Sequence, residues 1–84
     1  MARLTVRYFA GARAAAGRPE EPVELAGETT VAGVLDAVRA RHGEGLARVL
    51  TSSSFLLDGV AVRDRGVAVL DGSLLDVLPP FAGG

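Results

Sequence analysis

The end of the chain combines a stiff stretch with a terminus that has no side chains. Pro79 and Pro80 restrict the backbone where it would leave a sheet, and Gly83 and Gly84 close the sequence. The six residues from Pro79 onward span up to ~20 Å when extended, which is enough to enter a deep pocket on another protein. Because glycine has no Cβ, a narrow channel can admit Gly83 and Gly84 up to the terminal carboxylate.

The carboxylate of Gly84 is the group that we expect to react. An α-carboxyl group has a pKa of about 3.3–3.7, so it is ionised at neutral pH and is a poor electrophile. Activation, for instance as an acyl-adenylate, would let its carbon accept a nucleophile, and a sulfur nucleophile would give a thiocarboxylate. We therefore predict that Gly84 is the reacting residue, next to Gly83, at the end of a flexible tail formed by residues 79–84.

The side chains of the sequence offer little other chemistry. Cysteine and lysine are both missing, which excludes thiolate ligands, a catalytic Cys and a lysine nucleophile. We expect His42 to be solvated or paired with a helix dipole, and Glu20, Glu21 and Glu24 to form a solvated loop and strand face. The glycines match neither the dinucleotide pattern nor the P-loop pattern. We therefore expect no bound cofactor, no metal and no self-sufficient enzyme.

The composition indicates one globular domain that spans residues 1–84. Hydrophobic residues make up 49% of the chain and charged residues 23%, which is enough apolar material for a core. The net charge is -1, and the nine arginines are scattered rather than clustered as nucleic-acid binding requires. Apolar runs stay shorter than the ~18 residues of a membrane helix. We expect a cytoplasmic protein with neither a nucleic-acid nor a membrane partner.

The first half of the sequence predicts two strands. Residues 3–9 alternate strictly, which places Leu4, Val6 and Tyr8 on one face of the first strand. A second strand is expected at residues 22–25, after a proline-containing loop. Since the strand at residues 3–9 has one apolar face, that face should lie on the core.

A long helix is expected to follow a cap at Thr29 or Thr30 and to end at Gly43. Shorter helical segments are expected at residues 11–17 and 44–50. The apolar residues of the long helix recur at spacings i, i+3, i+4 and i+7, as in one amphipathic stripe. They are Val31, Val34, Leu35 and Val38.

The second half of the sequence is expected to contain only strands and turns. Asp58-Gly59 is typical of a two-residue hairpin turn. The apolar stretches lie at residues 54–57, 60–62, 67–70 and 74–78. The complete order predicts an α+β fold with a mixed sheet of about five strands packed on one main helix. This is the β-grasp arrangement of ubiquitin-like proteins.

An exposed patch is expected on the face of the sheet that points away from the helix. Alternation places Leu75 and Val77 toward the helix, so that Asp76 and its strand neighbours point outward. An exposed apolar patch of this kind commonly marks a protein interface. The alternative is an outer face covered by loops. We expect this patch, rimmed by Arg3 and Arg7, to continue into the tail as a partner interface that includes Arg7, Leu56, Leu74, Leu78, Pro80, Phe81 and Ala82.

The chain resembles the MoaD/ThiS family of sulfur carriers over nearly its whole length. Tyr8-Phe9-Ala10, with Arg13 and Gly17, resembles the opening strand and following loop of that family. Leu57-Asp58-Gly59 stands where the family usually has Val-Asn-Gly, and residues 78–84 match its closing signature. The ending Pro-Pro-Phe-Ala-Gly-Gly is most similar to that of molybdopterin synthase small subunits. Departures occur at Ala14 and at Ser73-Leu74, where the family often has acidic residues.

The resemblance implies a reaction cycle centred on Gly84. An adenylating enzyme related to ubiquitin activators would use ATP and Mg²⁺ to adenylate Gly84, and a sulfur donor protein would convert it to the thiocarboxylate. In complex with the molybdopterin synthase large subunit, which holds the catalytic residues, the sulfur would pass to cyclic pyranopterin monophosphate in molybdenum cofactor biosynthesis. Three alternatives remain: the same chemistry serving thiamine thiazole, cysteine or tRNA thiolation, a ubiquitin-like protein modifier, and a β-grasp interaction domain with an inert tail.

Overall fold

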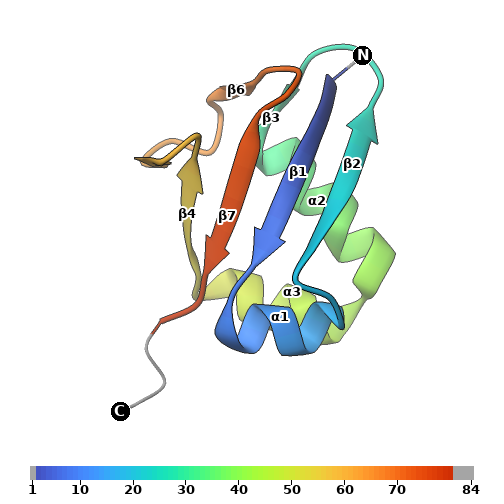
Figure 1. Cartoon of the computed structure of the whole chain (residues 1–84), viewed down its shortest axis with the longest axis vertical. Helices are drawn as coiled ribbons and strands as arrows, with labels where there is room; N and C mark the ends of the chain where they lie inside the picture. Colours follow the sequence, from blue (N-terminus) through green and yellow to red (C-terminus); the bar gives the residue numbers. More distant parts are fainter. Residues whose placement is uncertain (1, 81–84) are drawn as a thin grey trace.

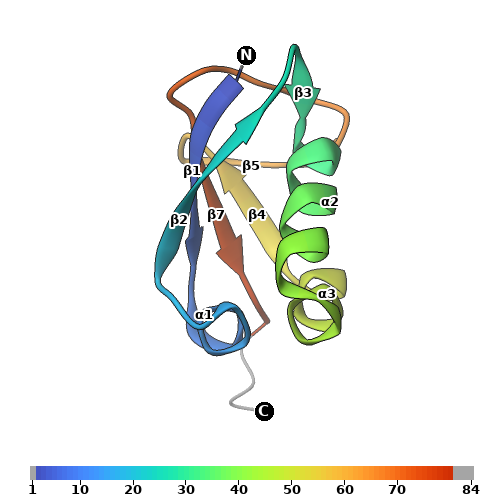
Figure 2. The ribbon, with the colours of Figure 1, turned by 90° about the vertical axis from the view of Figure 1, so that its right-hand side faces the viewer.

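The computed structural model describes residues 2–80, which form a layer of strands and a layer of helices (Figure 1). In chain order the elements are β1 (Ala2–Tyr8), α1 (Ala10–Ala16), β2 (Glu20–Leu25), β3 (Thr29–Thr30), α2 (Val31–His42), α3 (Glu44–Thr51), β4 (Ser54–Leu57), β5 (Val60–Ala61), β6 (Ala68–Val69) and β7 (Leu74–Leu78). Helices α2 and α3 lie on one side of the sheet, while α1 lies across its lower end (Figure 2).

The main sheet has five strands in the order β2-β1-β7-β4-β5. Strands β1 and β7 run parallel, with Thr5 opposite Leu74 and Arg7 opposite Asp76, and the other neighbours are antiparallel. The first and last long strands therefore lie side by side in the middle of the sheet (Figure 1). This confirms the predicted α+β class and the β-grasp arrangement, with a mixed sheet packed on a main helix.

The core lies between the inner face of this sheet and α2. Leu4, Val6 and Tyr8 of β1 are buried, as the alternation predicts, and so are Leu75 and Val77 of β7. The predicted stripe of α2 packs against them, with all four of its members buried. Because burying one such side chain contributes about 1.5–3 kcal/mol, this contact is the main source of stability for the two layers.

A second, two-stranded sheet is the part of the fold that the sequence did not predict. It pairs Thr29 with Val69 and Thr30 with Ala68. Strands of two residues have no measurable alternation, so periodicity does not reveal them. The pairing places the segment before β6 against the start of α2, where the carbonyl of Val67 accepts from the N–H of Val31 at 3.1 Å. Strand β2 also begins two residues earlier than expected, at Glu20.

The ends of α2 follow the predicted signals. Thr30 has an extended backbone, and its side-chain oxygen accepts a hydrogen bond from the N–H of Gly33 at 3.2 Å. Gly43 ends the helix with a φ of 82°, a conformation that favours glycine. Within residues 2–80, no helix has the length and apolar character needed to cross a bilayer.

We expect Thr30→Ala to lower the free energy of unfolding by about 1 kcal/mol, because the N–H of Gly33 loses its partner. Urea unfolding followed by circular dichroism measures the change. Thr30→Ser keeps the hydroxyl and should restore most of the loss. Thr51→Ala removes a hydroxyl at the exposed end of α3 that, among residues 2–80, bonds only to the carbonyl of Ala47, and should change the stability by less than about 0.5 kcal/mol. Equal losses in Thr30→Ala and Thr51→Ala would contradict the capping role.

Candidate functional site

Strand β7 holds the root of the C-terminal tail. It points toward the end of the molecule where α1 and α3 lie (Figure 1). The carbonyl of Val77 accepts a hydrogen bond from the N–H of Phe9 at 3.3 Å, and Leu78 is paired with Ser54 on the other side. Pro79 is half-buried and Pro80 is exposed. The chain is therefore held on both sides up to the residue before the two prolines.

Four of the predicted site residues lie beyond this point. Phe81, Ala82, Gly83 and Gly84 are outside the described residues, so the reactive role of Gly84 and the interface role of Phe81 and Ala82 stay predictions. Pro80 and Leu78 lie at the root of the tail, as expected from the sequence.

An apolar groove of about 650 Å³ adjoins this root. It runs between the start of α1 and the second half of α3, and Pro79 and Pro80 form part of its wall. Phe9 contributes an aromatic ring that is 40% exposed. Arg48 is the charged residue among the described residues of the lining. The lining consists of Phe9, Ala10, Gly11, Arg48, Val49, Ser52, Leu78, Pro79 and Pro80.

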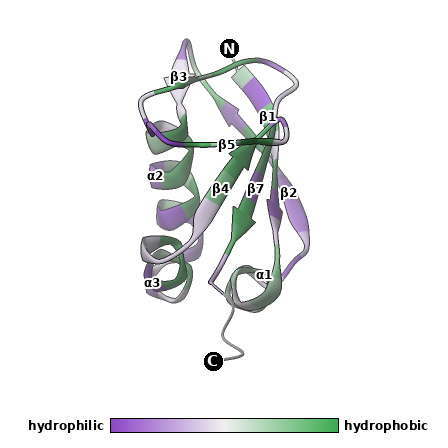
Figure 3. Cartoon of the chain, turned by 90° about the vertical axis from the view of Figure 1, so that its left-hand side faces the viewer, coloured by the Kyte–Doolittle hydropathy of each residue, from purple (hydrophilic) through white to green (hydrophobic). Residues whose placement is uncertain are grey.

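The outer face of the sheet gathers the other predicted interface residues. Leu56, Leu74 and Leu78 are half-buried and lie on the side opposite α2, since their strand neighbours Phe55 and Val77 belong to the core. Strands β4 and β7 are largely hydrophobic along their length (Figure 3). We refer to the surface formed by Leu56, Leu74, Asp76, Leu78 and Arg7 as the outer patch.

Within the outer patch, Arg7 reaches across from β1 to Asp76 of β7. Nε of Arg7 donates to one carboxylate oxygen at 2.7 Å, and Nη2 donates to the other at 3.0 Å. The hydrogen bonds that Arg7 donates to Asp76 are the main reason why the pKa of Arg7 rises above its usual value. Arg3, the other predicted rim residue, makes a looser pair with Glu24 at 3.6 Å, and both of these side chains are exposed. The sequence placed Asp76 on this face but did not identify it as the partner of Arg7.

Comparison with known proteins identifies the family. Residues 6–84 match the ThiS family, which is nearly the whole chain. The chain belongs to the ThiS family. The family match and the fold are those of a small ubiquitin-like sulfur carrier, as the resemblance predicted. No curated protein sequence gives a significant match.

Solved structures of similar proteins carry several names. A Pyrococcus furiosus protein described as molybdopterin converting factor subunit 1 is 25% identical, with a TM-score of 0.86 and coverage of 95% of this chain and 99% of that one. Small archaeal modifier protein 1 from Haloferax volcanii is 28% identical, with a TM-score of 0.84 and coverage of 95% and 99%. A chain of the BexX/CysO complex of Amycolatopsis orientalis is 28% identical, with a TM-score of 0.71 and coverage of 96% and 99%. These neighbours agree on the family and differ in the process that their names describe.

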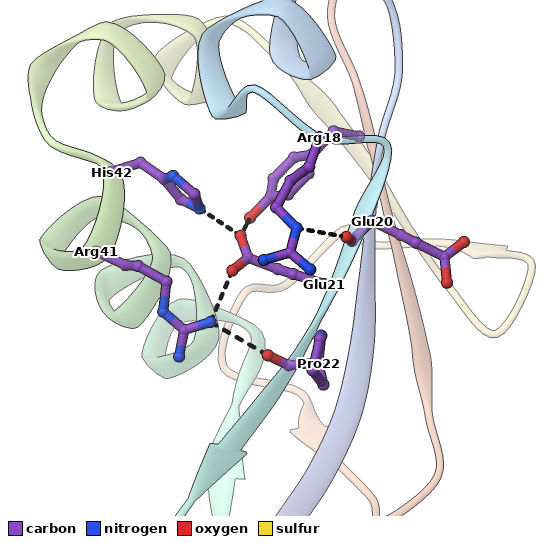
Figure 4. A network of polar contacts seen from close by, with 7 residues as sticks. Arg18, Glu20, Glu21, Pro22, Arg41 and His42 are labelled. Atoms are coloured by element: carbon purple, nitrogen blue, oxygen red, sulfur yellow. Dashed lines mark hydrogen bonds and ion pairs between the residues drawn. The ribbon is translucent and has the colours of Figure 1, made fainter.

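A buried polar network in this ThiS-family chain overturns two expectations about side chains. The side chain of Glu21 has no exposed area, so the prediction of a solvated face is wrong for Glu21, although Glu20 and Glu24 are exposed. His42, predicted to be solvated or dipole-paired, donates from Nε2 to Glu21 instead (Figure 4). Arg41 donates to the other oxygen at 2.7 Å. Glu21 therefore ties β2 to the end of α2.

The sequence contained the signals for this network. In β2, Glu21 alternates with Val23 and Leu25, so it shares their inward face. In α2, His42 stands eleven residues after Val31 and four after Val38, on the buried side of the helix. Within the part of the chain that the structure describes, no group of three or more acidic, His or Cys side chains is placed to hold a metal ion.

The network shifts the pKa values of Glu21 and Tyr8. Burial alone would raise the pKa of the Glu21 carboxyl, but the hydrogen bonds from Tyr8, Arg41 and His42 outweigh it and hold that pKa below its usual value. Burial, and then the hydrogen bond to Glu21, raise the pKa of the Tyr8 hydroxyl. Because Glu21 has a lower pKa in the folded state, its ionised form stabilises the fold above pH ~4.3, and this contribution is lost as pH falls through the folded-state value.

We expect Glu21→Gln to lower the free energy of unfolding at pH 7 by about 2 kcal/mol, because Arg41 loses its buried counter-charge and the hydrogen bonds from Tyr8 and His42 lose a charged acceptor. The difference in free energy of unfolding between the two proteins should narrow as pH falls below ~4.3, because Glu21 takes up a proton first in the unfolded state and, at lower pH, in the folded state. Urea unfolding at a series of pH values measures both effects. Glu24→Gln, on the same strand but in an exposed pair, should cost less than about 0.5 kcal/mol. A loss in Glu21→Gln that does not vary with pH would show that charge is not its cause.

Proposed function

We propose that this chain is the sulfur-carrying small subunit of a molybdopterin synthase, with the sulfur held as a thiocarboxylate on Gly84. The observation that supports the proposal most is the place in the sheet from which the tail begins. It continues a strand that is bonded on both sides in the middle of the sheet, and it reads Pro-Pro-Phe-Ala-Gly-Gly. The Pyrococcus furiosus neighbour, named as a molybdopterin converting factor subunit, supports the choice of pathway.

In the proposed cycle, the chain supplies the acyl group and its partners supply the catalysis. An oxygen of the Gly84 carboxylate attacks the α-phosphorus of ATP on an adenylating enzyme, and pyrophosphate leaves. Sulfur at the oxidation level of sulfide, delivered by a donor protein, attacks the acyl carbon and displaces AMP. The large subunit then passes the sulfur to cyclic pyranopterin monophosphate, and water restores the carboxylate. ATP and Mg²⁺ are therefore bound by the adenylating partner in this proposal.

A ubiquitin-like modifier is the second candidate function. The Haloferax volcanii neighbour, which is named a small archaeal modifier protein, favours it. Both candidates begin with adenylation of Gly84 and differ in the nucleophile that follows. Intact-mass analysis separates them, because a carrier gains the mass difference between sulfur and oxygen, whereas a modifier appears on heavier protein adducts.

We expect removal of Gly84 to reduce thiocarboxylate formation about a hundredfold, because the carboxylate then ends ~3.5 Å short of its position in the partner. The assay mixes the protein with ATP, Mg²⁺, an adenylating enzyme and a sulfur source, and follows the intact mass with time. Thr51→Ala, at the end of α3, is the matched control and should react at the full rate. Full-rate reaction without Gly84 would refute the carrier function.

We expect Leu74→Asp to weaken binding of the large subunit about tenfold or more, because it places a charge in the middle of the outer patch. Isothermal titration measures the affinity. Leu70→Asp is the matched control, since Leu70 is 70% exposed and lies in the loop before β7. Equal affinities for Leu74→Asp and the unchanged protein would remove the outer patch from the interface.

A further inference from the structure

The outer patch contains an acid where an apolar residue would be expected. Asp76 lies on the central strand β7, with Leu74 and Leu78 two residues away on the same face. Leu56 of β4 stands opposite it in register. Although no helix formed by residues 2–80 covers this face, the Asp76 side chain is only 9% exposed. Its neighbours and Arg7 therefore enclose it already in the free protein.

Arg7 is the accessible half of this pair. Its side chain is 40% exposed, compared with 9% for Asp76. The face therefore presents a cation to a partner and hides the anion. Glu20 stands opposite Arg7 in register on β2, but no ion pair joins these two among the described residues. A partner that covers the outer patch meets a guanidinium with leucines beside it.

Two contacts fix the orientation of the guanidinium. Asp76 holds it through two hydrogen bonds, as described above, and the ring of Phe9 lies 5.7 Å from its central carbon. Arginine has five N–H donors in a rigid planar fork, and Asp76 occupies two of them. Within residues 2–80, Arg7 makes no other side-chain hydrogen bond. A partner can thus bind the remaining donors without ordering a flexible side chain first.

We propose that the Arg7–Asp76 pair makes the outer patch selective for a partner surface that is apolar and carries a carboxylate opposite Arg7. This inference rests on the proposed function, and the occupant is the surface of the synthase large subunit that borders the channel for the tail. The charge of Arg7 and the leucines around Asp76 together select such a surface. A wholly apolar surface would strip water from the pair without replacing its hydrogen bonds, which disfavours it.

The test compares three forms of the full chain in titrations with the large subunit from the same organism. Replacing both charges with leucine, as Arg7→Leu with Asp76→Leu, should weaken binding about tenfold or more. It should also remove the decrease in association rate that added salt causes for the unchanged protein. The matched control is Asp36→Leu with Arg39→Leu, which deletes an ion pair on α2, on the other side of the sheet, and should bind with unchanged affinity.

Each outcome decides the inference. Equal or tighter binding by the leucine pair would overturn it, because the face would then act through its apolar area alone. If that variant fails to fold, Arg7→Lys decides: it keeps the charge but loses the fork, so weaker binding supports the inference and unchanged binding overturns it. Failure of the unchanged protein to bind the large subunit would overturn both this inference and the proposed function. If the unchanged protein binds the large subunit but removal of Gly84 does not slow thiocarboxylate formation, only the carrier function is overturned.

Discussion

The parallel pairing of β1 and β7 is the constraint on which the rest of the structure depends. Parallel neighbours cannot be joined by a tight turn, so the intervening chain must cross over one face of the sheet. Helix α2 makes this crossing and covers the inner face with its apolar stripe. As a result the last strand of the described chain lies in the middle of the sheet, and β1 and β4 hold it on both sides. Pro79 and Pro80 therefore follow a strand that has a paired neighbour on each side.

In this arrangement the two faces of the sheet differ in what covers them. The inner face is closed by α2 and contributes stability. None of the helices in the described part of the chain lies over the outer face, so its half-buried leucines remain available to another protein (Figure 1). The groove beside Pro79 and Pro80 adds apolar surface at the end where the tail begins. This scaffold therefore offers apolar surface both on its outer face and beside the root of the tail.

Much of this architecture could be predicted from the sequence because it depends on local patterns. Each of three features can be recognised from a few neighbouring residues: the strict alternation of β1, the apolar stripe of α2 and the capping hydroxyl of Thr30. The β3–β6 pair could not be predicted, since it joins two-residue strands that lie 38 residues or more apart in sequence. The reactive role of Gly84 and its neighbours still depends on the resemblance, because these residues lie outside the described part of the chain.

Glu21 and Asp76 show where sequence patterns reach their limit. Alternation gives the correct face for both acids, inward for Glu21 and outward for Asp76. It does not give their burial, which depends on cations from distant elements: Arg41 lies 20 residues from Glu21, and Arg7 lies 69 residues from Asp76. Both pairs are therefore tertiary features.

The two pairs differ in their surroundings. Glu21 lies against a helix end and accepts hydrogen bonds from three side chains, so its hydrogen bonding is satisfied within the fold. Asp76 and Arg7 lie among leucines on the uncovered face, where a second protein can complete the pairing.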